Sequence, residues 1–112
     1  MDKPTDKERV EHVLTSIKTI KNFVKGINET QFLKDKVLQS AVQFQFLIIG
    51  EAVKNIDSDL LKKHSFPWHI PRSFRNFIIH EYHGVKMEKI FLATQDLLKL
   101  EKVMKQILKE EF

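Results

Sequence analysis

Apolar residues recur every three or four positions through most of this chain, and that spacing is the period of an α-helix. Near the start of the chain the pattern runs through Val10, Val13, Leu14, Ile17, Ile20, Val24 and Ile27. Thr5, followed three residues later by Glu8, forms a capping box, and Gly26 is suited to end a helix. The sequence therefore predicts a first helix from about Asp6 to Lys25.

Three further segments carry the same period. We expect a helix from about Lys34 to Asn55, another from about Pro71 to Tyr82 or His83, and a last one from about Lys86 to Lys109. A short helical turn capped by Asp57 or Ser58 precedes the third of the main helices. No segment alternates in the manner of a β-strand. The expected fold is all-α, an up-and-down bundle of four main helices plus the short turn, in a single domain spanning residues 1–112.

The second and last main helices differ in how their apolar residues are distributed. The expected inner face of the second helix consists of Val37, Leu38, Ala41, Phe44, Ile48, Ala52 and Ile56. The expected inner face of the last helix includes Met87, Ile90, Phe91, Leu97, Leu98, Met104, Ile107 and Leu108. The second helix is also apolar off this face, at Phe46, Leu47 and Ile49, so it needs a second packing partner such as another subunit. Gly50 would let a backbone approach closely.

Composition excludes several classes of protein. The chain has no cysteine, which excludes disulfides and thiolate metal sites, and no apolar run long enough to span a membrane. Its N-terminus lacks the apolar core of a signal peptide, so we expect a cytoplasmic protein without membrane contact. The net charge of +4, from 19 basic and 15 acidic residues, favours phosphate-bearing partners only mildly.

Four polar side chains of different chemistry lie close together in the third main helix: Arg75, Asn76, His80 and Tyr82. At about 100° per residue, Arg75 and Tyr82 share one stripe of the helix, and Asn76 and His80 share the adjacent stripe. Arg75 and His80 are roughly 140° apart around the axis, so one helix does not aim both at a single atom. This separation suggests a site that is shared across a symmetric dimer.

These residues suit phosphodiester chemistry without a metal ion or cofactor. His80 can move a proton during attack by a ribose 2′-hydroxyl on the adjacent phosphate, and Arg75 can stabilise the added negative charge. The structural alternatives are a packed histidine at position 80 and an ion pair between Arg75 and a carboxylate. Glu51 is expected to pair with a basic group such as Arg75 or Lys54. His80 and His83 lack the further ligands that a metal site needs, so no metal is expected.

Asn76 and Tyr82 leave more than one interpretation open. Asn76 can orient His80 one turn later or contact substrate, and it can equally tie the helix to the connector that contains Trp68. Trp68, with Phe66, is expected to form a hydrophobic plug at the end of the bundle. Tyr82 is a half-buried packing residue in the structural alternative.

The pattern Arg-Asn-x-x-x-His-x-Tyr from Arg75 to Tyr82 resembles the signature of the HepT-like branch of the HEPN superfamily. Ile48 to Ala52 resembles that family's Ile-Gly-Glu-Ala segment. The residues from Pro67 to Pro71 resemble the approach to its catalytic helix, and those from Tyr82 to Val85 resemble the exit. The chain departs from the family pattern at Lys86, where an aspartate is expected.

The resemblance implies a homodimeric toxin of a type II toxin–antitoxin pair, a metal-independent ribonuclease with catalytic residues Arg75 and His80 and with Asn76 orienting or binding substrate. It further implies RNA as the substrate and an MntA-type nucleotidyltransferase antitoxin as the partner. That partner would neutralise the toxin by transferring AMP to Tyr82. Two alternatives remain open at this stage: a non-catalytic subunit that recruits or presents substrate to a nucleotidyltransferase, and a purely structural subunit of a helical assembly.

Overall fold

The first predicted helix is present with its predicted cap. A computed structural model describes residues 3–80 and 86–112, and for His80 it describes the backbone alone. In it, α1 spans Asp6–Val24. The Glu8 backbone N–H donates to Thr5 Oγ1 at 3.1 Å, and the Thr5 N–H donates to Glu8 Oε1 at 3.0 Å, which completes the capping box. Gly26 follows with a φ of +73°, a conformation that glycine adopts without strain.

The second predicted helix is present, and a short helix that was not predicted precedes it. A short helix, α2, spans Glu29–Lys34, and the long helix α3 spans Lys36–Asn55. α3 begins at Lys36, close to the expected start at about Lys34, because Asp35 accepts from the Leu38 backbone N–H at 3.0 Å and caps the helix. The sequence does carry a signal for α2: Asn28 and Gln31 form a second capping box.

The expected inner face of α3 is partly wrong. Val37 is 82% exposed and Phe44 is 59% exposed, whereas Phe46 and Ile49, expected off the inner face, belong to the core. The physical reason is that α3 is apolar on both faces, so that hydrophobic periodicity alone could not tell which face would meet the other helices. Buried on α3 are Val42, Phe46, Ile49, Gly50, Ala52 and Val53.

The connector between α3 and the helix of the polar cluster folds as expected. A short helix, α4, spans Ser58–Lys62 with Asp57 as its N-cap. Trp68 is buried, its ring centroid lies 4.8 Å from that of Phe66, and its indole N–H donates to the carbonyl groups of Leu61 at 3.0 Å and His64 at 3.1 Å. The expected hydrophobic plug is confirmed. The next helix, α5, spans His69–His80 and so begins two residues before Pro71.

The last predicted helix bends into two helices, so its prediction as one continuous helix is wrong. α6 spans Met87–Gln95 and α7 spans Leu98–Glu111. Near the break the Thr94 hydroxyl donates to the Phe91 carbonyl at 2.6 Å, and the bend brings Leu97 and Leu100 into the core at 4% exposure each. Leu98, expected inside, is 57% exposed.

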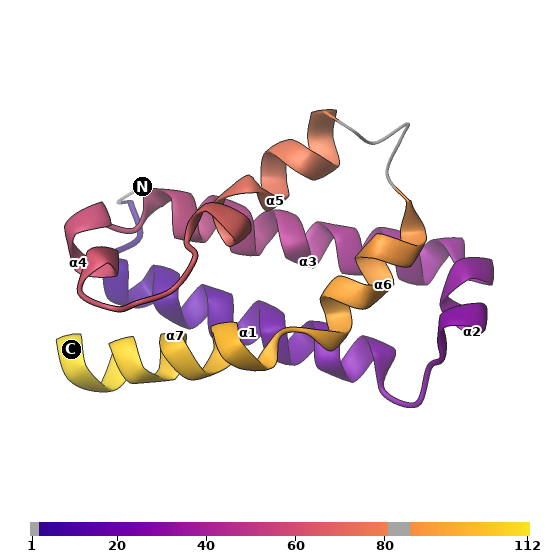
Figure 1. Cartoon of the computed structure of the whole chain (residues 1–112), viewed down its shortest axis with the longest axis horizontal. Coiled ribbons are helices and arrows are strands. Elements are labelled where there is room, and N and C mark those ends of the chain that lie inside the picture. The colour runs from indigo at the N-terminus through magenta and orange to yellow at the C-terminus, as the bar shows by residue number, and fades with distance from the viewer. Residues whose placement is uncertain (1–2, 81–85) are drawn as a thin grey trace.

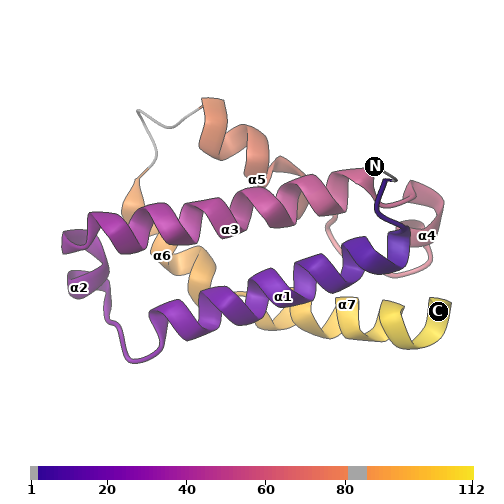
Figure 2. The ribbon, with the colours of Figure 1, turned by 180° about the vertical axis from the view of Figure 1, so that it is seen from behind.

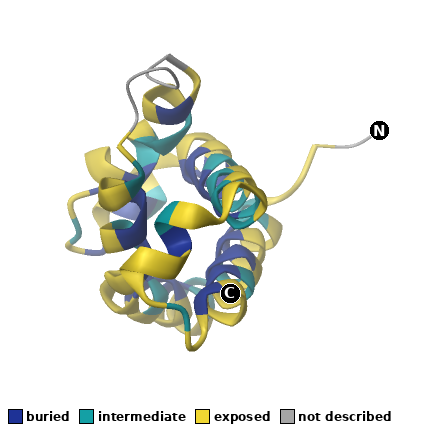
Figure 3. Ribbon diagram, turned by 90° about the vertical axis from the view of Figure 1, so that its right-hand side faces the viewer, coloured by how far each residue is buried: buried dark blue, intermediate teal, exposed yellow. Residues whose placement is uncertain are grey.

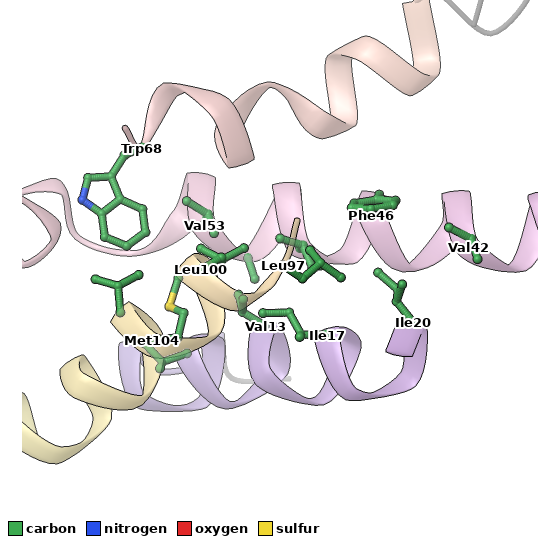
Figure 4. Close-up of a cluster of buried hydrophobic side chains, with 14 of the residues drawn as sticks. Val13, Ile17, Ile20, Val42, Phe46, Val53, Trp68, Leu97, Leu100 and Met104 are labelled. Carbon is green, nitrogen blue, oxygen red and sulfur yellow. The ribbon is translucent and has the colours of Figure 1, made fainter. Parts of the chain in front are cut away.

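The helices form layers around α3. Figures 1 and 2 show α1 along one side of α3 and α5 crossing the opposite side, while α7 lies beside α1. Buried residues face the interior between these helices (Figure 3), and side chains from α1, α3 and α7 meet in the core shown in Figure 4. Within residues 3–80 and 86–112 all regular elements are helices, which confirms the all-α class. None of the helices described is both long enough and apolar enough to cross a membrane.

Candidate functional site

The helix of the polar cluster is seated on α3 through Gly50. A Cβ atom at position 50 would lie 2.8 Å from the Arg75 backbone nitrogen, 3.2 Å from Phe74 Cβ and 3.3 Å from the Pro71 carbonyl oxygen. Only glycine therefore permits this approach without a shift of α5. Phe46 supports the same contact, because its ring packs edge-on against Phe74 with centroids 5.2 Å apart. A backbone does approach closely at Gly50, but it belongs to α5 of the same chain and not to the second subunit that the sequence suggested as a partner.

The residue after Gly50 forms an ion pair with the guanidinium of Arg75. Arg75 Nε lies 3.3 Å from Glu51 Oε2, which confirms one of the two partners expected for Glu51. The side chains of Arg75 and Glu51 are 40% and 55% exposed, so the ion pair contributes little to stability, and its main effect is on orientation. The five N–H donors of the guanidinium suit an anion such as a phosphate.

A series of polar contacts extends from Arg75 across three helices. The Asn55 side-chain amide donates to the Glu51 carbonyl oxygen at 2.8 Å and lies 3.3 Å from Glu51 Oε1. The Asn55 carbonyl in turn accepts from Arg9 of α1 at 2.6 Å, and Arg9 also pairs with Asp6 at 3.6 Å. Glu51 is thus held from one side while it holds Arg75 on the other. This arrangement limits the positions that the guanidinium can take.

A cleft of about 610 Å³ opens beside this series of contacts. One wall is formed by Arg75 and Ile79 of α5 and the opposite wall by Arg9 and His12 of α1. The floor and the remaining rim consist of Lys3, Pro4, Leu47, Ile48, Glu51, Ala52 and Asn55. The cleft combines an apolar floor with cationic walls. Chemically it suits a ligand with a flat apolar part and a negative charge.

The other predicted site residues are placed as follows. Asn76 is exposed on α5, and Trp68 has its indole N–H bonded to Leu61 and His64. His80 is the last residue of α5, and its side chain lies outside the description. Tyr82 and His83 also lie outside the described residues. The expected convergence of Arg75 and His80 on one atom therefore stays a prediction.

One histidine of the connector has a structural role. His64 is buried; its Nε2 lies 3.0 Å from Glu111 Oε2 and its Nδ1 lies 3.9 Å from Glu110 Oε2. The hydrogen bond from His64 holds the pKa of the Glu111 carboxyl below its ordinary value of 4.5. These three residues are the one group of potential metal ligands in the described part of the chain, and His69, the other connector histidine, is exposed. Their contacts tie the end of α7 to the connector, away from Arg75.

Sequence reasoning missed the wall that α1 contributes to the cleft. Arg9 and His12 lie three residues apart and so share a side of α1, but this spacing is common on exposed helix faces. Their importance depends on the packing of α1 against α3, which brings them opposite Arg75. No local motif carries that information.

Comparison with known proteins supports the same family as the motif. A family model described as "Ribonuclease HepT-like" matches residues 13–107. The chain is 38% identical over 109 residues to "Putative RNase TTE0752" of Caldanaerobacter subterraneus subsp. tengcongensis, covering 96% of this chain and 97% of that protein. It is 34% identical over 95 residues to "Probable ribonuclease HepT" of Thermococcus cleftensis, covering 84% of this chain and 86% of that protein. No solved structure matches the chain significantly. The chain belongs to the HepT-like ribonuclease family.

Proposed function

We propose that this protein is a metal-independent ribonuclease and the toxin of a type II toxin–antitoxin pair. The observation that carries the proposal is the position of Arg75: its guanidinium is paired with Glu51 at the edge of a cleft, on the helix that also carries Asn76 and His80 of the family motif. A permanently charged, bidentate donor at a cleft edge suits the binding of a phosphodiester. Membership of a ribonuclease family and the match to named ribonucleases support the same substrate class.

The reaction that fits these residues is internal transfer within RNA. The ribose 2′-oxygen attacks the adjacent phosphorus while His80 takes the 2′-hydroxyl proton, and the bond from phosphorus to the 5′-oxygen of the next nucleotide breaks. A proton returns to that oxygen, so the products are a 2′,3′-cyclic phosphate and a 5′-hydroxyl. Arg75 stabilises the negative charge that builds on the phosphate during attack. Asn76, exposed on the next stripe of α5, orients His80 or contacts the substrate.

Two chains complete the proposed site. Arg75 and His80 are separated by roughly 140° around one helix, so a second copy related by a twofold axis supplies the complementary group. Uncovered apolar residues on these two helices support this assembly: Phe44 of α3 is 59% exposed and Ile79 of α5 is 42% exposed. A pairing of α3 and α5 with their counterparts would cover them.

Replacing His80 by alanine tests the proposed nuclease directly. We expect wild-type protein to cleave total RNA and leave 2′,3′-cyclic phosphate ends without added metal, and His80→Ala to lower the rate by about 100- to 10,000-fold through loss of proton transfer. His69→Ala, a change at an exposed histidine of the first turn of α5, is the matched control and should retain the wild-type rate. Circular dichroism and sedimentation establish that fold and assembly are unchanged. Equal cleavage by His80→Ala would contradict the proposal, and wild type without cleavage would favour the non-catalytic subunit.

Neutralisation is proposed to occur by AMP transfer from an MntA-type nucleotidyltransferase to Tyr82. Attachment of a bulky anion near Arg75 would compete with RNA for the guanidinium. Incubation of the two proteins with ATP should add the mass of AMP to the peptide that contains Tyr82 and stop RNA cleavage. Tyr82 is the single tyrosine of the chain, so Tyr82→Phe is a clean control that should remain active and unmodified. An adduct at another residue, or neutralisation of Tyr82→Phe by AMP transfer, would refute this mode of inhibition.

A further inference from the structure

We propose that His12 of α1 contacts the RNA phosphate next to the scissile one, and that the cleft between α1 and α5 holds the intervening nucleotide. This inference depends on the proposed ribonuclease function and extends it to a residue outside the motif. His12 lines the same cleft as Arg75. It would make α1 part of the substrate site.

The architecture places the two side chains across a single cleft. α3 packs against α1 on one side and against α5 on the other, as Figures 1 and 2 show. The cleft follows the surface of α3 between these two helices, and its volume of about 610 Å³ is in the range of small-molecule sites. We therefore infer that a strand of RNA held by Arg75 extends along this cleft to His12.

The charge of the cleft favours a phosphate. Among the described residues that line it, Glu51 is the only carboxylate and is paired with Arg75, whereas basic groups come from Lys3, Arg9 and Arg75. Arg9 is engaged by the Asn55 carbonyl at 2.6 Å and by Asp6 at 3.6 Å, so its role is to hold the α1 wall. The other α1 side chain that lines the cleft is the imidazole of His12, which is exposed. An imidazole at such a position donates a hydrogen bond to a phosphate oxygen.

The floor suits the other parts of a nucleotide. Leu47, Ile48 and Ala52 give α3 an apolar surface at the base of the cleft. An unpaired base or the face of a ribose can lie on such a surface while the phosphates on either side contact Arg75 and His12. Single-stranded RNA, whose bases are available for this contact, is therefore the form that the site would take.

Binding of an uncleavable RNA separates this inference from catalysis. A fluorescent 2′-O-methyl RNA oligonucleotide lacks the attacking hydroxyl, so its dissociation constant can be measured by anisotropy with wild type, His12→Ala, His12→Lys and His69→Ala. We expect His12→Ala to raise the dissociation constant roughly 3- to 10-fold, as for the loss of one ordinary hydrogen bond. His12→Lys should restore affinity, and it should steepen the dependence of log affinity on log salt by about 0.7 through one added phosphate contact. His69→Ala should match wild type.

Cleavage kinetics provide the second measurement. His12→Ala should raise the KM for unmodified RNA by a similar factor and change kcat by less than about 3-fold, because the residue binds a neighbouring phosphate and moves no proton. Unchanged affinity and KM in His12→Ala, or an equal loss in His69→Ala, would overturn the inference. If wild type cleaves RNA with kinetics independent of His12, only this inference fails. If wild type binds RNA through His12 but does not cleave it, only the nuclease fails, and if it neither binds nor cleaves, both fail.

Discussion

Alanine at position 75 is expected to lower the rate constant for RNA cleavage by about 100- to 1,000-fold, the effect of removing one group that stabilises transition-state charge. The free energy of unfolding should change by less than about 1 kcal/mol, because the ion pair with Glu51 is exposed to solvent. Single-turnover cleavage with saturating protein measures the first quantity, and urea unfolding measures the second. A large loss of activity with little loss of stability would mark Arg75 as a residue of the reaction.

Two further variants separate charge from geometry. Arg75→Lys keeps the charge but loses the bidentate donor, so it should recover only part of the lost rate. Glu51→Gln keeps the shape of the side chain that holds Arg75 but removes its charge, and it should reduce the rate by a smaller factor than Arg75→Ala. When both residues are changed, the loss should equal that of Arg75→Ala alone, since Glu51 acts through Arg75. Full activity in Arg75→Ala would contradict the role of Arg75. A double variant whose loss of rate equals the combined losses of the two single variants would contradict the idea that Glu51 acts through Arg75.

Local signals in the sequence predicted the starts of two helices, where the residues that decide the structure are close together in the chain. The capping box of Thr5 and Glu8 fixes the start of α1, and Asp57 caps α4. The break between α6 and α7 escaped prediction because no glycine or proline marks it. There the burial of Leu97 and Leu100 outweighs the continuity of the helix, and this depends on where the other helices lie.

The candidate site was likewise predictable from the sequence only in part. Arg75 on α5 and the Gly50 and Glu51 pair on α3 were evident in the sequence, and the structure connects them through one close approach and one ion pair. The wall formed by α1 was not evident, since His12 gains its place only when α1 packs against α3. The prediction of which face of α3 is buried was also partly wrong, because both faces are apolar and only the tertiary fold selects between them.

Alanine at position 50 is expected to lower the rate of RNA cleavage about 100-fold, although this position is far along the chain from Arg75 and His80. Its Cβ atom would lie 2.8 Å from the Arg75 backbone nitrogen, so α5 must move away from α3. The cost of this overpacking, about 1–3 kcal/mol, is offset in part by the helix propensity gained on replacing glycine, about 1 kcal/mol. The protein should therefore stay folded. A displacement of about 1 Å at a catalytic group is nonetheless enough to reduce a rate 100-fold.

Gly26→Ala is the matched control for this prediction, because it introduces the same methyl group at a position far from α5. Gly26 has a φ of +73°, and a Cβ atom there would meet no other atom within 4 Å, so alanine strains the backbone by about 1–2 kcal/mol without touching α5. Both variants should lose comparable stability in urea unfolding, yet only Gly50→Ala should lose cleavage per folded molecule. Normal cleavage by Gly50→Ala would mean that the seating of α5 on α3 does not position Arg75. Equal losses in both variants would mean that cleavage follows global stability, and the glycine beside Glu51 would then have no specific part in the site.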